Sequence, residues 1–150
     1  MKLRLYHHPD GARVAYRERG TGPPVILWHS ELLSHRELTP LVEGLEHRHR
    51  VVLPHLPLHG DSEDRPRHPY TADWLSEVVA RFCADVGGPR PIVGGHGLGG
   101  ELVLRAVEQR RMRPSRLILM PTRLHRGSGE DRTWERWLRV ARFGATPGLD

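Results

Sequence analysis

The stretch from Val93 to Gly100 constrains the fold of this chain more than any other. Apolar residues lead into it from Pro91, the stretch itself is rich in glycine, and an amphipathic segment from Leu98 to Arg110 follows at once. An apolar run, a glycine-rich turn and a helical periodicity, in this order, predict a buried strand, a sharp turn and a helix.

The turn matches the frame of the G-x-S-x-G motif. In that motif a strained strand-to-helix turn holds a serine so that its hydroxyl stands clear at the top of a sheet. Gly95 and Gly99 occupy the two glycine positions, but Gly97 stands where the serine would be. The pattern therefore predicts the backbone of such a turn without its reactive atom, and it leaves open whether the chain is an enzyme.

Length and composition indicate one ordinary globular domain over residues 1–150. The chain is 37% hydrophobic and 27% charged, and no apolar run approaches the roughly 18 residues of a membrane span, so we expect no membrane partner. Met1 to Gly11 contain no apolar run of the kind found in secretory signals, which predicts a cytoplasmic location. The lone Cys83 has no partner for an internal disulfide and is expected to be a small core residue.

A net charge of +5 raises the possibility of a nucleic-acid partner. Lys2 is the sole lysine, and the arginines are scattered among acidic residues rather than gathered in one block. No aromatic residues alternate with them to stack on bases. We therefore expect no nucleic-acid binding.

The rest of the chain predicts alternating strands and helices after a leading hairpin. Two short strands, 3–6 and 13–17, flank a turn at Pro9-Asp10-Gly11. The next predicted elements are a buried strand at 25–28, a helix at 34–46 with Pro40 in its first turn, a strand at 50–53 and a loop at 55–70. They are followed by a helix that begins at the cap Thr71 and ends at Gly87-Gly88, and by the strand and helix on either side of Gly97. The last two predicted elements are a strand at 116–120 and a helix at 131–143. This order predicts an α/β fold with a mostly parallel sheet, and ligands of such sheets bind beyond the carboxyl ends of the strands.

Four segments together resemble the N-terminal half of an α/β-hydrolase-fold protein. They are Asp10-Gly11 with Val14-Ala15-Tyr16, the strand and its end from Val25 to Ser30, the loop from Leu56 to Ser62, and the turn at Gly97. They occur in the family's order and at its spacings, and the resemblance covers nearly the whole chain.

The resemblance implies a pocket at the strand ends formed by His29, Ser30, Glu31, His96, Gly97 and Leu98. It places Gly97 at the nucleophile position and assigns the two amides of the oxyanion hole to the positions of Glu31 and Leu98. Without the nucleophile, only about 10³ to 10⁴ of the rate enhancement over water would remain. A carboxylate at position 31 also opposes negative charge that develops in the hole.

The resemblance implies that the family's acid and histidine follow later strands than those predicted here, in a domain that would need roughly 100 more residues. We therefore expect a truncated domain with an incomplete sheet, in which 131–143 resembles the start of a lid. The open edge after the strand at 116–120 predicts a possible homodimer.

Three functional hypotheses follow. The residues favour a non-catalytic protein whose strand-end pocket binds a small apolar ligand. The alternative is an esterase or related hydrolase whose activity requires a longer chain. A third possibility is a fragment of marginal stability with no function of its own.

Two further site hypotheses are less favoured by the sequence. His29, His55, His59 and His96 could line a metal site, but three of them stand where family members carry histidine without metal, so we expect neither a metal nor a cofactor. Ser30 or Ser62 could replace the missing nucleophile, but neither lies on the strained turn.

Overall fold

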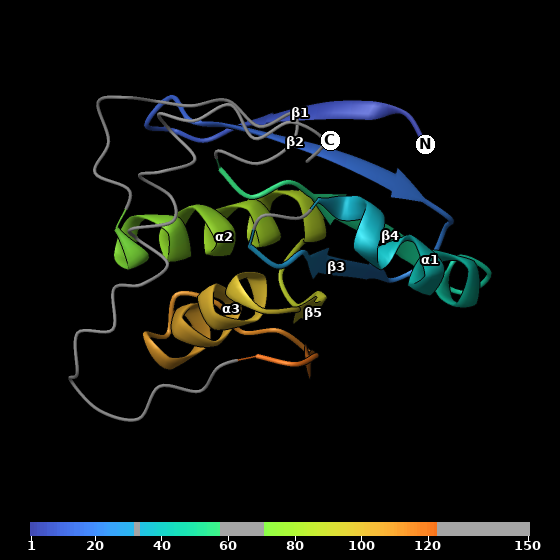
Figure 1. Cartoon of the computed structure of the whole chain (residues 1–150). Helices are drawn as coiled ribbons and strands as arrows, with labels where there is room; N and C mark the ends of the chain where they lie inside the picture. The colour runs from blue at the N-terminus through green and yellow to red at the C-terminus, as the bar shows by residue number, and fades with distance from the viewer. Residues whose placement is uncertain (32–33, 58–70, 123–150) are drawn as a thin grey trace.

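The computed structural model describes residues 1–31, 34–57 and 71–122. Within this part of the chain a six-stranded sheet has the order β1-β2-β4-β3-β5-β6 (Figure 1). The strands are β1 Leu3–His7, β2 Arg13–Arg19, β3 Pro24–Trp28, β4 Arg50–Pro54, β5 Ile92–Gly95 and β6 Arg116–Leu119. The predicted helix at 131–143 and most of the predicted loop at 55–70 lie outside the described residues.

The pairing of the strands confirms the mostly parallel sheet with a leading hairpin. β1 and β2 pair antiparallel, and β2 joins the rest of the sheet antiparallel to β4. The pairs β3 with β4, β3 with β5, and β5 with β6 are parallel. The helices between β3, β4, β5 and β6 are the crossovers that parallel pairing requires.

The prediction of one continuous helix at 34–46 is wrong, because the segment forms two elements. A 3-10 turn, η1 His35–Leu38, is followed by a short helix, α1 Thr39–Leu45. Pro40 explains the break, because it has no N–H with which to continue the α-helical ladder from η1. The backbone N–H of Thr39 instead closes a tighter turn onto the Arg36 carbonyl, and Pro40 takes the first turn of α1.

The second helix, α2 Ala72–Gly87, begins and ends where the sequence predicts. The Thr71 hydroxyl accepts a hydrogen bond from the backbone N–H of Trp74 at 3.1 Å, and Gly88 ends the helix at a φ of +80°. The third helix, α3 Leu98–Glu108, starts directly after the glycine-rich turn.

Alternate residues along the strands bury into two separate cores, one on each face of the sheet. Ile26 and Val52 face α2 and α3, whereas Val25 and Val51 face α1. At the centre of the first core, Phe82 makes edge-on ring contacts with Tyr6, Tyr16 and Trp28, with centroids 5.2–5.3 Å apart. Cys83 is buried beside it, as predicted.

The sheet is not closed at β6 within the described residues. Leu117, Ile118 and Leu119 are between 37% and 41% exposed there, which is unusual for apolar strand residues. The homodimer predicted through this edge stays a prediction. None of the described helices is long and apolar enough to span a membrane.

The aromatic cluster around Phe82 supplies a stability test. Phe82→Ala removes the ring that joins the hairpin, β3 and α2, so we expect the free energy of unfolding to fall by about 3–5 kcal/mol. Urea denaturation measures it. The neighbouring exposed residue provides the control, since Arg81→Ala should cost less than about 1 kcal/mol. A similar small loss for both variants would contradict this description of the core.

Candidate functional site

The candidate site lies where β3, β4 and β5 end side by side. The register pairs Trp28 with Gly95, so His29 and Ser30 leave β3 next to the point where His96 and Gly97 leave β5. The N–H of His96 donates to the Trp28 carbonyl at 3.0 Å, and the N–H of Gly97 donates to the Pro121 carbonyl at 2.9 Å. These bonds tie the turn to the chain that follows β6 as well as to β3.

The turn has the strained backbone that its sequence predicts. Gly97 has φ +56° and ψ −125°, a conformation that residues with a side chain rarely adopt. Gly99 allows α3 to approach β3 closely, because a Cβ on Gly99 would lie 2.6 Å from the Trp28 carbonyl oxygen. The turn therefore has the backbone geometry that its sequence predicts, with glycine at residue 97.

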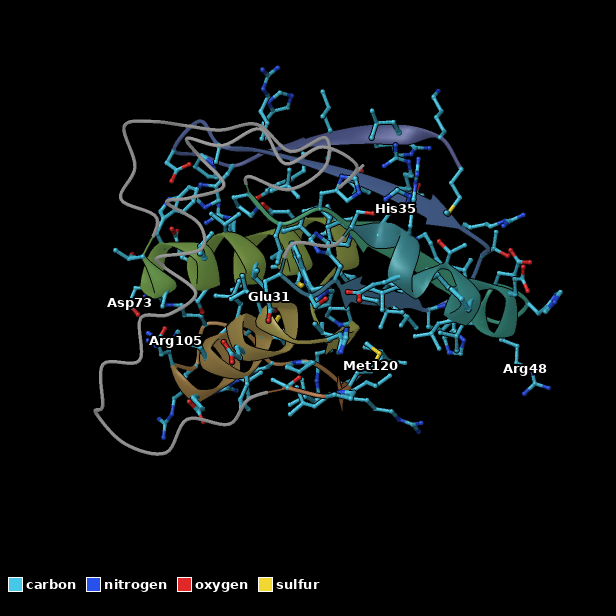
Figure 2. The ribbon with its side chains drawn as sticks, in the orientation of Figure 1. Glu31, His35, Arg48, Asp73, Arg105 and Met120 are labelled. Carbon is cyan, nitrogen blue, oxygen red and sulfur yellow. The ribbon has the colours of Figure 1, made fainter. Side chains whose placement is uncertain are left out.

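Glu31 accepts a hydrogen bond from a backbone amide that the sequence analysis expects in the oxyanion hole. Its Oε2 accepts a hydrogen bond from the N–H of Leu98, the first residue of α3, at 2.7 Å. Figure 2 labels the Glu31 side chain beside α3. A Cβ on Gly97 would lie 2.6 Å from that same oxygen and 2.7 Å from Cβ of Ser30. A carboxylate therefore fills the space beside the turn in which a serine side chain would stand.

The position of Glu31 is electrostatically favourable for the carboxylate itself. The first N–H groups of a helix have no partner within the helix and carry its positive dipole end. A negative side chain there gains about 0.3–1 kcal/mol, and its hydrogen bond is charge-assisted. The amino end of α3 therefore stabilises a side chain of the protein itself.

Glu37, which the sequence analysis did not select, links two of the predicted site residues. Its carboxylate accepts hydrogen bonds from both the N–H and the hydroxyl of Ser30, the latter at 3.1 Å. Its Oε2 also lies 3.0 Å from Nδ1 of His96. Glu37 lies in η1, and no motif in the sequence distinguishes it from the neighbouring polar residues.

This arrangement weakens Ser30 as a substitute nucleophile. Activation of a serine requires a base that accepts its proton and is itself held in position. The Ser30 hydroxyl donates to Glu37, while the His96 imidazole bonds to that same carboxylate rather than to the hydroxyl. Ser62, the other candidate, lies outside the described residues.

His29 is buried, and both nitrogens of its ring are engaged by the backbone. Nδ1 is 2.7 Å from the Ser30 carbonyl oxygen, and Nε2 accepts the N–H of Leu56 at 2.9 Å. A carbonyl can only accept and an amide N–H can only donate, so Nδ1 carries the proton and Nε2 does not. His29 is therefore a neutral residue that joins the ends of β3 and β4, and it has no nitrogen left for a metal.

The other histidines do not converge as the metal hypothesis requires. The ring of His55 packs against His29 with centroids 5.8 Å apart, and its Nε2 bonds to Nδ1 of His35. His96 faces Glu37, and His59 lies outside the described residues. The cluster that forms, of His29, His35 and His55, was not predicted because nothing in the sequence places η1 over the end of β4.

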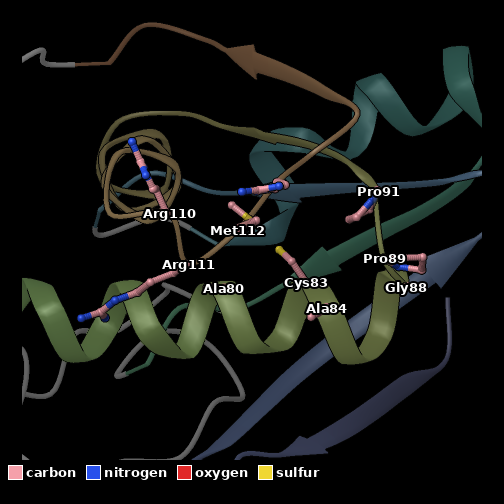
Figure 3. Close-up of a pocket in the computed structure, with 10 residues that line it drawn as sticks. Ala80, Cys83, Ala84, Gly88, Pro89, Pro91, Arg110, Arg111 and Met112 are labelled. Atoms are coloured by element: carbon pink, nitrogen blue, oxygen red, sulfur yellow. The ribbon is translucent and has the colours of Figure 1, made fainter.

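A separate pocket of about 290 Å³ opens at the other end of β5 (Figure 3). Cys83, Pro91 and Met112 lie among its lining residues, and Arg110, Arg111 and Arg113 also border it. Burial raises the pKa of the Cys83 thiol to about 12, so the thiol is not reactive at neutral pH. This pocket lies at the amino ends of the strands, away from the edge where ligands of parallel sheets bind.

Comparison with known proteins agrees with the fold. The sequence profile described as alpha/beta hydrolase fold matches residues 23–144. The chain belongs to the α/β-hydrolase fold family. The resemblance that the sequence predicted is thereby confirmed.

Three similar proteins show what share of a relative's length this chain covers. The chain is 30% identical over 84 residues to a magnesium-chelatase 30 kDa subunit of Rhodobacter capsulatus, covering 56% of this chain and 30% of that protein. A thermophilic esterase from Thermogutta terrifontis superposes with a TM-score of 0.77 and 27% identity, over 99% of this chain and 56% of the esterase. A serine-to-glycine mutant of an N-acyl homoserine lactonase, complexed with N-hexanoyl homoserine lactone, gives a TM-score of 0.67 and 26% identity, over 79% and 45%. The chain thus spans from under a third to just over half the length of these relatives.

The close approach of α3 to β3 is testable with a pair of glycine substitutions. Gly99→Ala places a methyl group against the Trp28 carbonyl, and we expect the free energy of unfolding to fall by about 2 kcal/mol or more. Gly44→Ala is the matched control, because its Cβ meets nothing within 4 Å and α1 should gain about 0.5–1 kcal/mol. Urea denaturation measures both changes. Equal midpoints for the two variants would show that the approach is looser than described.

Proposed function

We propose that this α/β-hydrolase-fold chain binds a small uncharged ligand at its strand-end site and does not carry out serine-hydrolase chemistry. The observation that carries the proposal is the 2.7 Å hydrogen bond from the Leu98 N–H to Glu31. The amide that would stabilise a transition state already has an anionic partner within the protein.

Two independent features oppose acyl transfer at this site. The reaction needs a nucleophile to form the covalent intermediate, and Gly97 supplies none. It also needs donors aimed at the developing oxyanion, and loss of one such donor costs about 10² to 10³ in rate. Glu31 both engages the Leu98 donor and places negative charge beside it, so restoring a serine alone would leave the second obstacle in place.

The charges around the site favour a neutral ligand over an anion. Glu31 and Glu37 present carboxylates, and the basic side chain of His96 contacts Glu37. An anionic ligand would meet like charge at short range, which is unfavourable. A neutral acyl compound could place its carbonyl at the Leu98 amide by displacing the Glu31 side chain.

The lactonase mutant supports this choice of ligand. Its structure pairs a serine-to-glycine change with a bound N-hexanoyl homoserine lactone, a small uncharged acyl compound. The esterase alternative, in which a longer chain completes the catalytic residues, draws support from the hydrolases that this chain resembles. The two proposals differ in whether the bound acyl compound is turned over.

We expect the chain to bind N-hexanoyl homoserine lactone in isothermal titration calorimetry and to hydrolyse a short-chain nitrophenyl ester no faster than buffer. Glu31→Ala should tighten lactone binding by about tenfold, because the carboxylate no longer competes for the Leu98 amide. Glu43→Ala, an exposed glutamate on α1, is the matched control and should leave binding unchanged.

Ester turnover well above buffer that Ser30→Ala abolishes would overturn the non-catalytic proposal. Absence of lactone binding in both the parent chain and the Glu31→Ala variant would overturn the ligand assignment.

A further inference from the structure

A second cluster of polar side chains lies away from the strand-end site, between the β1–β2 turn and α2. His8 and Asp10 come from the turn, and Glu77 comes from the second turn of α2. One ligating atom from each of these residues lies within 4.8 Å of the other two. The cluster is independent of the ligand proposed above.

Asp10 contacts Nδ1 of His8 through both its carboxylate and its backbone N–H. Its Oδ1 lies 2.6 Å from Nδ1 of His8 and accepts the Ala12 N–H at 3.0 Å, while Oδ2 accepts the indole N–H of Trp74 at 2.6 Å. The backbone N–H of Asp10 also lies 3.3 Å from Nδ1, so Asp10 holds the His8 ring through this nitrogen and leaves Nε2 toward Glu77.

Nε2 of His8 is a buried ligating atom that the described part of the chain leaves without a hydrogen bond. The His8 side chain is only 2% exposed. The nearest acidic atom, Oε1 of Glu77, lies at 3.5 Å, beyond the 2.7–3.2 Å of ordinary N–H···O hydrogen bonds. A buried polar atom in this condition calls for an explanation, and an ion is one of the usual ones.

The separation of these two atoms fits a shared metal ion. Two ligand atoms bound tetrahedrally to zinc at about 2.0–2.1 Å lie roughly 3.4 Å apart. The 3.5 Å between His8 and Glu77 matches that spacing. A carboxylate that holds the far nitrogen of a metal-binding imidazole, as Asp10 does here, is the usual second partner of such a ligand.

We propose that His8 Nε2 and the Glu77 carboxylate bind a divalent transition-metal ion, with zinc as the best match, and that Asp10 orients His8 for it. The mixed nitrogen and oxygen ligands favour zinc over magnesium or calcium, which prefer oxygen alone. Water completes the coordination from the side of Glu77, whose side chain is 49% exposed. The ion would fasten the leading hairpin to α2.

The sequence analysis expected no metal, and it had no signal for this site. The three residues do not form a short ligand motif, since Glu77 lies on a helix far along the chain from the turn that carries His8 and Asp10. The folded hairpin is what brings them together.

Calorimetric titration of the chain with zinc chloride tests the proposal. The sequence has 11 histidines, so weak background binding is expected and the comparison between variants decides. His8→Gln should abolish the tightest zinc site, and Glu77→Gln should weaken it by at least about tenfold. His7→Gln, which alters the exposed neighbour of His8, is the matched control and should leave that site unchanged. Magnesium should not compete.

Zinc affinity and stoichiometry that are the same in the parent chain, His8→Gln and Glu77→Gln would overturn the proposal. Circular dichroism shows whether His8→Gln folds. If it does not fold, Glu77→Gln alone decides, because its side chain is on the surface of α2.

Discussion

The hydrogen bonds that hold the Gly97 turn between its neighbours determine most of what the strand-end site can do. His96 is tied to the end of β3 and Gly97 to the segment after β6, so the turn cannot relax into an ordinary loop. The left-handed φ of Gly97 and the close packing at Gly99 follow from that confinement. As a result, the first amide of α3 points at the space where β3 ends.

An amide in this position binds whichever acceptor is available. In an α/β hydrolase with an intact catalytic site, that acceptor would be the substrate oxyanion. In this chain Glu31 follows β3 and supplies its side-chain carboxylate, at a distance typical of a charge-assisted hydrogen bond. Glycine at residue 97 is compatible with this arrangement, because a side chain there would meet Glu31 and Ser30.

The sequence predicts the elements better than it predicts the contacts among polar side chains. Apolar runs, the Thr71 cap and the glycines around Gly97 act through local geometry, and the structure places them as expected. The prediction of one helix at 34–46 was wrong because Pro40 lacks the N–H that would continue the α-helical hydrogen bonds, and a 3-10 turn forms before α1. Glu37, the pairing of His35 with His55, and the cluster around His8 depend on segments far apart in the sequence, for which composition and spacing carry no signal.

The most direct test of this account is the amide resonance of Leu98 in a ¹H–¹⁵N NMR spectrum of the parent chain and of Glu31→Ala. A charge-assisted hydrogen bond predicts a downfield, exchange-protected amide proton in the parent. In the variant it should move upfield and exchange faster, while the rest of α3 is little changed. A Leu98 resonance that is the same in both proteins would contradict the claim that Glu31 occupies this amide.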